Sequence, residues 1–315
     1  MAPEALTSAL LPFGYSPREA AFVAAAALHS GYFLARQYSP KRGKAADTLC
    51  RKLAAFEHAS SAALGGGVRL YHLHAKPLYR ALGQTDNRHR RERDQVRAKV
   101  MGLDYVLLHP QYRYLPTEQD KLAYFCDERG IAREALPTKV YTGKRQDRTL
   151  RFFVDKYPVR IESESHNVAF CYIDDGIFTP PGFATWLKQY SRLIEALGAA
   201  EIVYVASSPA ALATAEREFT KAFPSAEDSL SGELRGYFQM RREIEQRGPA
   251  GRSQQELDAF RRLSRRYAEG RFEQLYALWR DACAPARSGP QVTFSTFVLP
   301  FSYAFFGTAG VGGKR

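Results

Sequence analysis

The chain has 315 residues, of which 45% are hydrophobic and 25% charged, and its formal net charge at pH 7 is +12. This composition excludes an intrinsically disordered chain, and the length is enough for two or three domains whose cores need no disulfides. The positive charge favours a polyanionic partner, and nucleic acid is a stronger expectation than a merely solvated basic surface.

The cysteines and the apolar runs indicate a cytoplasmic protein. Cys50, Cys126, Cys171 and Cys283 are widely spaced and form no Cys-x-x-Cys pair, which favours buried free thiols over a zinc site. No signal peptide is recognisable, and the apolar run 20–28 is far shorter than a membrane span. We therefore expect a cytoplasmic location, no membrane association and no cofactor.

The first third of the chain predicts a winged helix-turn-helix module over residues 16–85, after an N-terminal arm over residues 1–15. A capping box from Ser16 to Glu19, with proline at the first helical position, starts an alanine-rich helix. That helix is expected to end near Gly31.

Two more helices and a hairpin complete the predicted module. Segments 32–38 and 44–57 fit helices, separated by a turn that contains Pro40 and Gly43. Residues 64–73 fit a strand, a three-glycine turn and a second strand. Three helices followed by a hairpin is the order of a winged helix, in which the third helix enters the major groove.

The rest of the chain predicts a linking helix, a mixed α/β domain and a helical extension, so the expected fold class is α+β. Helical periodicity over 77–108 supplies the linking helix, assigned to residues 86–115. Residues 116–226 are assigned to the mixed domain, and residues 227–315 to the extension, with a second capping box at Ser253, and a tail.

Within the mixed domain and the extension, the apolar patterns predict individual strands and helices. The expected strands are 149–161, 167–173 and 201–206, the expected helices are 117–129, 183–197 and 209–223, and 292–306 is strand-like.

Basic residues gather on the predicted third helix and on the segment before it. Phosphates attract lysine and arginine, and base edges are read by polar side chains. The candidate nucleic-acid contacts here are Arg36, Lys41, Arg42, Lys44, Thr48, Arg51 and Lys52, with Asp47 as an accompanying acid. The alternative is a solvated helix face in a winged fold that binds protein.

Two further basic positions lie outside that helix. Arg69 follows the three-glycine turn, whose lack of side chains would allow close approach to a sugar-phosphate backbone, although a simple tight turn explains the glycines equally well. The arginine-rich centre of the linking segment adds Arg88, Arg90 and Arg91 as candidate phosphate contacts.

A pair of carboxylates follows two strands of the mixed domain. Asp155 and Asp174 have the layout that holds Mg²⁺ in many nucleases. Gly176 stands where such sites carry a lysine, and turn formation also explains the sequence Asp-Asp-Gly. No nucleophile elbow, phosphate-binding loop or dinucleotide fingerprint is present. We therefore assign no catalytic residue.

Three stretches resemble the replication-relaxation family of plasmids and other mobile elements. They are 33–37 leading into 44–56 with the hairpin 68–73, the Arg88-His89 step, and 170–176 with the helix and strand after it. The resemblance spans about residues 20–210. It implies a winged helix joined to a degenerate domain of the PD-(D/E)xK nuclease type, whose acids would match Asp155 and Asp174.

The expected function is therefore binding of double-stranded DNA in replication, mobilisation or transcription control of a mobile element. A second copy of the chain or another protein of the same element is the expected protein partner. Two alternatives remain open at this point: a divalent-metal nuclease that uses Asp155 and Asp174, and an adaptor whose winged fold binds protein in a larger complex.

Overall fold

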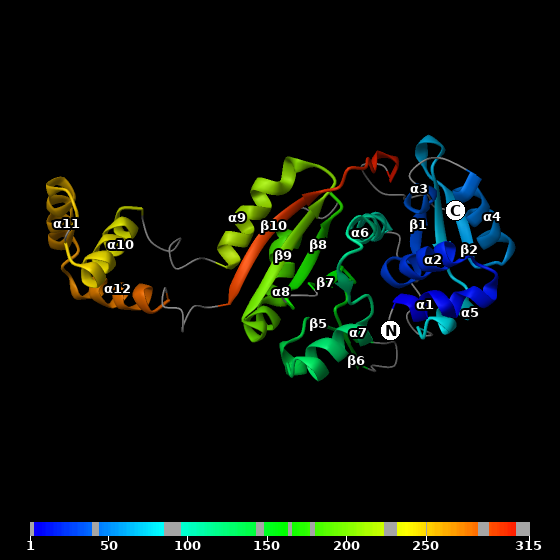
Figure 1. Cartoon of the computed structure of the whole chain (residues 1–315), viewed down its shortest axis with the longest axis horizontal. Helices are drawn as coiled ribbons and strands as arrows, with labels where there is room; N and C mark the ends of the chain where they lie inside the picture. Colours follow the sequence, from blue (N-terminus) through cyan, green and yellow to red (C-terminus); the bar gives the residue numbers. More distant parts are fainter. Residues whose placement is uncertain are drawn as a thin grey trace.

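The protein is α+β, and its described residues form three separate sheets (Figure 1). The structure is a computed structural model that describes residues 3–39, 44–84, 96–142, 148–162, 166–176, 180–223, 232–249, 251–282 and 290–306. The expected fold class is confirmed at the level of α+β with mixed sheets.

Helices cover the faces of the sheets and also form a separate group. The helices are α1 (Pro3–Leu10), η1 (Leu11–Phe13), α2 (Pro17–His29), α3 (Ala35–Tyr38), α4 (Lys44–Ala55), η2 (Gly65–Gly67), α5 (Lys76–Ala81), α6 (Val96–Leu108), α7 (Glu118–Leu122), η4 (Ala123–Glu128), η5 (Arg133–Ala135), α8 (Pro180–Leu197), η6 (Pro209–Ala211), α9 (Leu212–Ala222), α10 (Gly232–Arg247), α11 (Gln254–Arg266), α12 (Gly270–Ala282) and η7 (Ala304–Phe306). The strands are β1 (Tyr32–Leu34), β2 (Ala59–Ala63), β3 (Arg69–Leu73), β4 (Arg113–Tyr114), β5 (Thr138–Thr142), β6 (Arg148–Phe152), β7 (Val159–Ile161), β8 (Val168–Asp174), β9 (Ala199–Ala206) and β10 (Gln291–Val298).

The N-terminal part packs helices against a three-stranded antiparallel sheet of order β1-β3-β2. The predicted capping box is confirmed, because the Ser16 side chain accepts from the Glu19 N–H and Glu19 accepts from the Ser16 N–H. The alanines of α2 allow close packing in a core that includes Leu49 of α4 and Leu73 of β3.

The segment 32–38, predicted to be a helix, begins as a strand. Gly31, with φ of +73°, ends α2, and the next three residues form β1. Tyr32 stacks on His72 and Phe33 stacks on Tyr71 across the pair β1–β3. Cross-strand aromatic stacking and complete burial therefore override the helical periodicity, and only α3 remains helical.

The glycine hairpin is confirmed, although its first strand begins earlier than predicted. β2 and β3 pair in antiparallel register from Ala59↔Leu73 to Ala63↔Arg69. The turn between them is η2, in which Gly66 and Gly67 have positive φ values of +68° and +72°. Glycine adopts this left-handed conformation without a steric penalty.

The prediction of one continuous helix over 77–108 is wrong, because the helix is interrupted after Ala81. α5 stops at Ala81, because Gly83 adopts φ of +71° and the Gln84 N–H donates to the Tyr79 carbonyl at 2.7 Å. This is a glycine-terminated helix end. α6 begins at Val96, and β4, inside the expected linking segment, belongs to a sheet.

The five-stranded sheet has the order β10-β9-β8-β7-β4. β8, β9 and β10 are mutually parallel, while β7 is antiparallel to β8 and to β4. The strand-like segment predicted over 292–306 is confirmed as a strand over β10. It pairs with β9 along its full length, so the sheet extends beyond the expected boundary at residue 226.

The strand predicted over 149–161 is divided between two sheets. β6 pairs with β5 in a two-stranded sheet, and β7 joins the five-stranded sheet. Between them, Phe153 and Lys156 adopt positive φ values of +49° and +56° and Pro158 precedes β7, so the backbone turns. A strand cannot continue through two left-handed residues.

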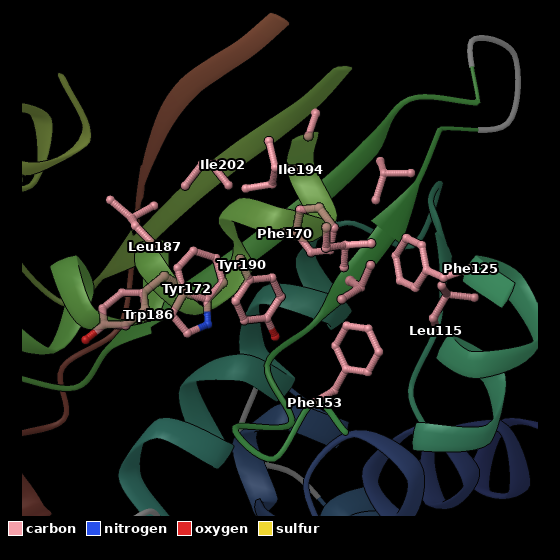
Figure 2. Close-up of a cluster of buried hydrophobic side chains, with 14 of the residues drawn as sticks. Leu115, Phe125, Phe153, Phe170, Tyr172, Trp186, Leu187, Tyr190, Ile194 and Ile202 are labelled. Carbon is pink, nitrogen blue, oxygen red and sulfur yellow. The ribbon is translucent and has the colours of Figure 1, made fainter. Parts of the chain in front are cut away.

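α8 and α9 cover one face of the five-stranded sheet. Figure 2 shows Phe170 and Tyr172 of β8 against Trp186 and Tyr190 of α8, within an aromatic cluster. The ring of Phe170 lies 5.2 Å from that of Tyr190 in an edge-to-face contact. Large aromatic side chains bury the most apolar surface per residue, so this face supplies the main core.

The opposite face of the sheet packs on α6 and on the segment after β10. Cys171, Ile173 and Val205 face Met101 of α6 in a second core. The same core includes Tyr32 of β1, so this layer joins the N-terminal part to the five-stranded sheet.

α10, α11 and α12 lie between α9 and β10 in the chain and form a group set apart from the sheets (Figure 1). Their own aromatic core contains Tyr237, Phe238, Tyr276 and Trp279. The predicted capping box at Ser253 is confirmed by its reciprocal hydrogen bonds with Glu256. No helix in the described part of the chain combines the length and apolarity needed to cross a bilayer.

The fold predicts unequal costs for the same substitution at two phenylalanines. Phe170 is fully buried in the aromatic cluster, whereas Phe56 is 44% exposed. We expect Phe170→Ala to lower the free energy of unfolding by about 3–5 kcal/mol and Phe56→Ala to lower it by about 1 kcal/mol or less. Urea titration followed by circular dichroism measures both, and equal losses would contradict the assignment of the core.

Candidate nucleic-acid interface

α4 turns one side into the core and the other outward, as expected for a surface helix. Its inward residues recur every three or four positions, and they are Ala46, Leu49, Cys50 and Leu53. Its outward, exposed residues include Lys44, Asp47, Thr48 and Arg51. The helix predicted over 44–57 is therefore confirmed, with a polar outer face.

The Arg51 guanidinium, on the outer side of α4, has only weak internal partners. The Thr48 hydroxyl donates to the Lys44 carbonyl at 2.7 Å and accepts from Arg51 Nη2 at 3.5 Å. Arg51 Nε lies 3.4 Å from the Asp47 carbonyl. Hydrogen bonds this long and this exposed contribute little. The Arg51 guanidinium can therefore turn towards an incoming phosphate at small cost.

Arg69 lies on the side of the hairpin that faces α4. Alternate residues of a strand share a face, so Arg69 shares a face with Tyr71. The ring centroids of Tyr71 and Phe33 lie 5.1 Å apart in a stacked arrangement, and the Tyr71 hydroxyl interacts electrostatically with Cys50 and Asp47 of α4. Burial is the main cause that raises the pKa of Tyr71 to about 12, and the charge of Arg69 opposes it. Arg69 also donates to Ser61 Oγ at 3.2 Å, across the hairpin.

The side chain of Lys52, near the end of α4, bonds to residues at the N-terminal end of α2. Its Nζ donates to Glu19 Oε2 at 2.6 Å and to the Gly14 carbonyl at 3.1 Å. Burial alone would raise the pKa of Glu19, but the hydrogen bonds from Lys52 and Ser16 lower it overall. The sequence analysis counted Lys52 as a nucleic-acid contact, whereas the structure gives it a role in joining α4 to α2.

Arg36 is likewise engaged inside the protein. Its guanidinium donates two parallel hydrogen bonds, each of 2.7 Å, to the carboxylate of Asp104 on α6, which is 2% exposed. The guanidinium carbon of Arg36 lies 4.1 Å from the centroid of the Phe301 ring. The Tyr303 hydroxyl donates to the Asp104 carboxylate at 2.6 Å. This bidentate pair is structural, so Arg36 is removed from the candidate interface.

The three-glycine turn of the hairpin is partly covered by the segment after β10. A Cβ built on Gly65 would lie 3.6 Å from the backbone oxygen of Phe305 in η7. Gly66 and Gly67 have open space around their Cα atoms. The expected approach of this turn to a sugar-phosphate backbone is therefore restricted to its outer two glycines.

Five of the predicted contacts lie outside the described residues. They are Lys41, Arg42, Arg88, Arg90 and Arg91. The described candidates that remain exposed and are not bonded into the core are thus Lys44, Thr48 and Arg51 of α4 and Arg69 of β3.

The carboxylates of the mixed domain are engaged in hydrogen bonds within the fold. Asp155 Oδ2 accepts from Trp186 Nε1 at 2.7 Å and from the Tyr190 hydroxyl at 2.9 Å, and its Oδ1 accepts from a backbone N–H. Asp174 accepts from the Gly176 N–H at 2.9 Å and from the Tyr204 hydroxyl at 2.6 Å. The Asp174 carboxylate therefore stabilises the turn at the end of β8, which is the role that the turn interpretation predicted.

One of the two paired acids, Asp155, lines a small cavity. A cavity of about 50 Å³ is lined by Asp155, Asp175, Lys99 and Lys156, together with His29 of α2, but not by Asp174. Within the described residues, no group of three or more acidic, histidine or cysteine side chains is arranged to hold a metal ion.

Several buried charges were not predicted from the sequence pattern, among them Asp104 and Lys121. Asp104 lies in the apolar run of α6, and Lys121 of α7 is 1% exposed with its Nζ 3.0 Å from the Tyr157 carbonyl. Burial lowers the pKa of Lys121 to about 8, against the opposing charge of Asp155. A charged residue within an apolar helix is a usable signal for Asp104, but nothing in the sequence indicates that Arg36 is its partner.

In comparisons with known proteins, no protein-family model, curated protein or solved structure matches the chain.

Loss of the buried ion pair predicts a large loss of stability. Arg36→Ala would leave the Asp104 carboxylate buried with only the Tyr303 hydroxyl as a donor among these partners, so we expect a loss of about 3–5 kcal/mol in the free energy of unfolding. Arg18→Ala, at an exposed arginine of α2, should change it by no more than about 0.5 kcal/mol. Urea unfolding compares them, and similar small effects would contradict the structural role of Arg36.

The pKa of Lys121 predicts a pH dependence of stability. The folded pKa of about 8 lies below the ordinary value of 10.5, so the unfolded chain binds more protons between these pH values. Stability due to this group therefore rises with pH over that window. The unfolding free energy of the wild type minus that of Lys121→Met should rise by about 2 kcal/mol from pH 7 to pH 9.5, because only the wild type carries the titrating amine. A difference independent of pH would contradict the shifted pKa.

Proposed function

We propose that this chain binds double-stranded DNA through α4 and the β2–β3 hairpin, in the manner of a winged helix. The observation that carries the proposal is that the basic and hydroxyl side chains on the outer side of α4, together with Arg69 on the hairpin that follows it, are exposed. The α4 residues are Lys44, Thr48 and Arg51. These side chains combine phosphate-binding cations with a hydroxyl that is able to contact a base edge.

The order of elements supports the proposal. The chain runs α2, β1, α3, α4, β2, β3, and the three strands form one antiparallel sheet. A winged helix has the same succession, with a recognition helix before the hairpin. α4 would be the recognition helix and η2 the tip of the wing.

The rigidity of the scaffold also favours recognition. α4 is held on its inner side by Leu49 and Leu53, which are fully buried, and at its end by the ion pair of Lys52 with Glu19. A helix fixed in this way presents its outer side chains at constant spacing, which lowers the entropic cost of binding. The net charge of +12 adds long-range attraction to a polyanion.

The biological role proposed for DNA binding is replication, mobilisation or transcription control of a mobile element. It rests on the resemblance to the replication-relaxation family and on no similarity found by comparison. A cytoplasmic location is part of the same proposal, because Cys50, Cys126 and Cys171 are free thiols, as is usual in a reducing compartment.

The proposal predicts the effect of charge reversal on the outer face of α4. Lys44→Glu/Arg51→Glu should weaken binding to a random-sequence DNA duplex at least tenfold in 50 mM salt. It should also lower the slope of log K against log salt by about 2, since two phosphate contacts are lost. Fluorescence anisotropy over a salt series measures both quantities.

The matched control reverses two exposed basic residues of the β5–β6 sheet. Lys139→Glu/Arg148→Glu changes the net charge by the same amount at positions outside the proposed surface. It should reduce affinity less and leave the salt slope nearly unchanged. Equal losses in both variants would show a general effect of net charge, and no binding by the folded wild type would favour the adaptor alternative.

A further inference from the structure

The two edge strands of the five-stranded sheet, β4 and β10, differ in length and in sequence. β4, at one end, has two residues and carries Arg113. β10, at the other end, has eight residues, Gln291–Val298, without a charge, proline or glycine. Edge strands are usually shortened, charged or interrupted, because unpaired backbone groups attract another strand. β4 follows that rule, and β10 does not.

Backbone hydrogen bonds define which residues of β10 face outward. The Gln291 N–H donates to the Gly198 carbonyl at 2.8 Å, and the Leu299 N–H donates to the Ala206 carbonyl at 2.9 Å. The N–H and C=O groups of a strand residue point to one side and alternate along the strand. The odd-numbered residues therefore bond to β9, and Val292, Phe294, Thr296 and Val298 direct their backbone groups to the outer edge.

The outer edge has no strand partner within the described residues, since β10 pairs with β9 alone there. Its backbone groups therefore form a row of donors and acceptors about the length of one ordinary strand. Strand addition supplies hydrogen bonds to such a row and is a common mode of association.

The sequence of β10 is complementary to itself in antiparallel register. Pairing about Ser295 places Val292 opposite Val298 of a second copy and Phe294 opposite Thr296, with Thr293 opposite Phe297 on the other face. Pairs of β-branched and aromatic residues stabilise neighbouring strands, and no like charges meet. A two-fold axis through Ser295 is then the only symmetry that this register requires.

We propose that β10 is the dimer interface of this protein, where two copies join their five-stranded sheets by antiparallel pairing of β10 about Ser295. The partner is a second copy because the strand complements its own sequence and carries no charge that would select an acidic or basic peptide. The proposal is independent of DNA binding, since β10 contains none of the residues assigned to the nucleic-acid interface.

The register is tested by site-directed cross-linking. Ser295 would form a non-hydrogen-bonded pair with its own copy, with Cα atoms about 4.5 Å apart, which suits a disulfide. Ser295→Cys should therefore yield a covalent dimer on mild oxidation, seen as a species of twice the chain mass in non-reducing gels. Thr293→Cys is the matched control: it would lie opposite Phe297 and should cross-link no more than the wild type does.

The edge itself is tested by removing one outward N–H. Thr296→Pro keeps every bond to β9 but cannot donate across the edge, and proline is tolerated on edge strands. Sedimentation velocity should give a dimer of two 35.4 kDa chains for the wild type and for Thr296→Val, which keeps the N–H, and a monomer for Thr296→Pro. Near-UV circular dichroism checks that the variants stay folded.

Two results would overturn the proposal. One is a wild-type chain that sediments as a monomer at tens of micromolar. The other is a dimer in which Ser295→Cys cross-links no better than Thr293→Cys, because the two copies would then meet elsewhere. If Thr296→Pro does not fold, the cross-linking comparison still decides between these outcomes.

Discussion

The buried carboxylate of Asp104 is the constraint on which the arrangement of this protein depends. A charge that is 2% exposed must be compensated, and its partners come from distant parts of the chain: Arg36 of α3 and Tyr303 beyond β10. The bidentate geometry fixes α3 against α6, and Tyr303 brings the segment after β10 to the same place. The N-terminal sheet and the five-stranded sheet are therefore joined by one polar network inside an apolar layer.

This network also shapes the surface available for binding. It uses Arg36 internally and places Phe305 beside Gly65, so the hairpin turn is covered on one side. Among the described candidates, those of α4 and Arg69 remain exposed, whereas Arg36 and Lys52 are bonded within the protein. Charge alone overestimates an interface, because arginines and lysines that hold a fold together are not distinguished by composition from those that meet a ligand.

The sequence predicted elements well where local signals are strong. Capping boxes at Ser16 and Ser253, the helix α4 and the glycine hairpin follow from short-range rules and are confirmed. It was wrong at β1, where burial and stacking override helical periodicity, and at the split between β6 and β7, which two left-handed residues cause. The pairing of β10 with β9, and of Arg36 with Asp104, depends on contacts across about 90 and 68 residues, which no local pattern encodes.

The most direct test of the account is hydrogen exchange of the full chain with and without a 20-base-pair duplex at low salt. The account predicts that DNA slows amide exchange in α4 and in the β2–β3 hairpin, residues 44–73, more than in any other region. Slowed exchange confined to the α10–α12 group, or none despite measurable binding, would contradict the assignment of the interface to this surface.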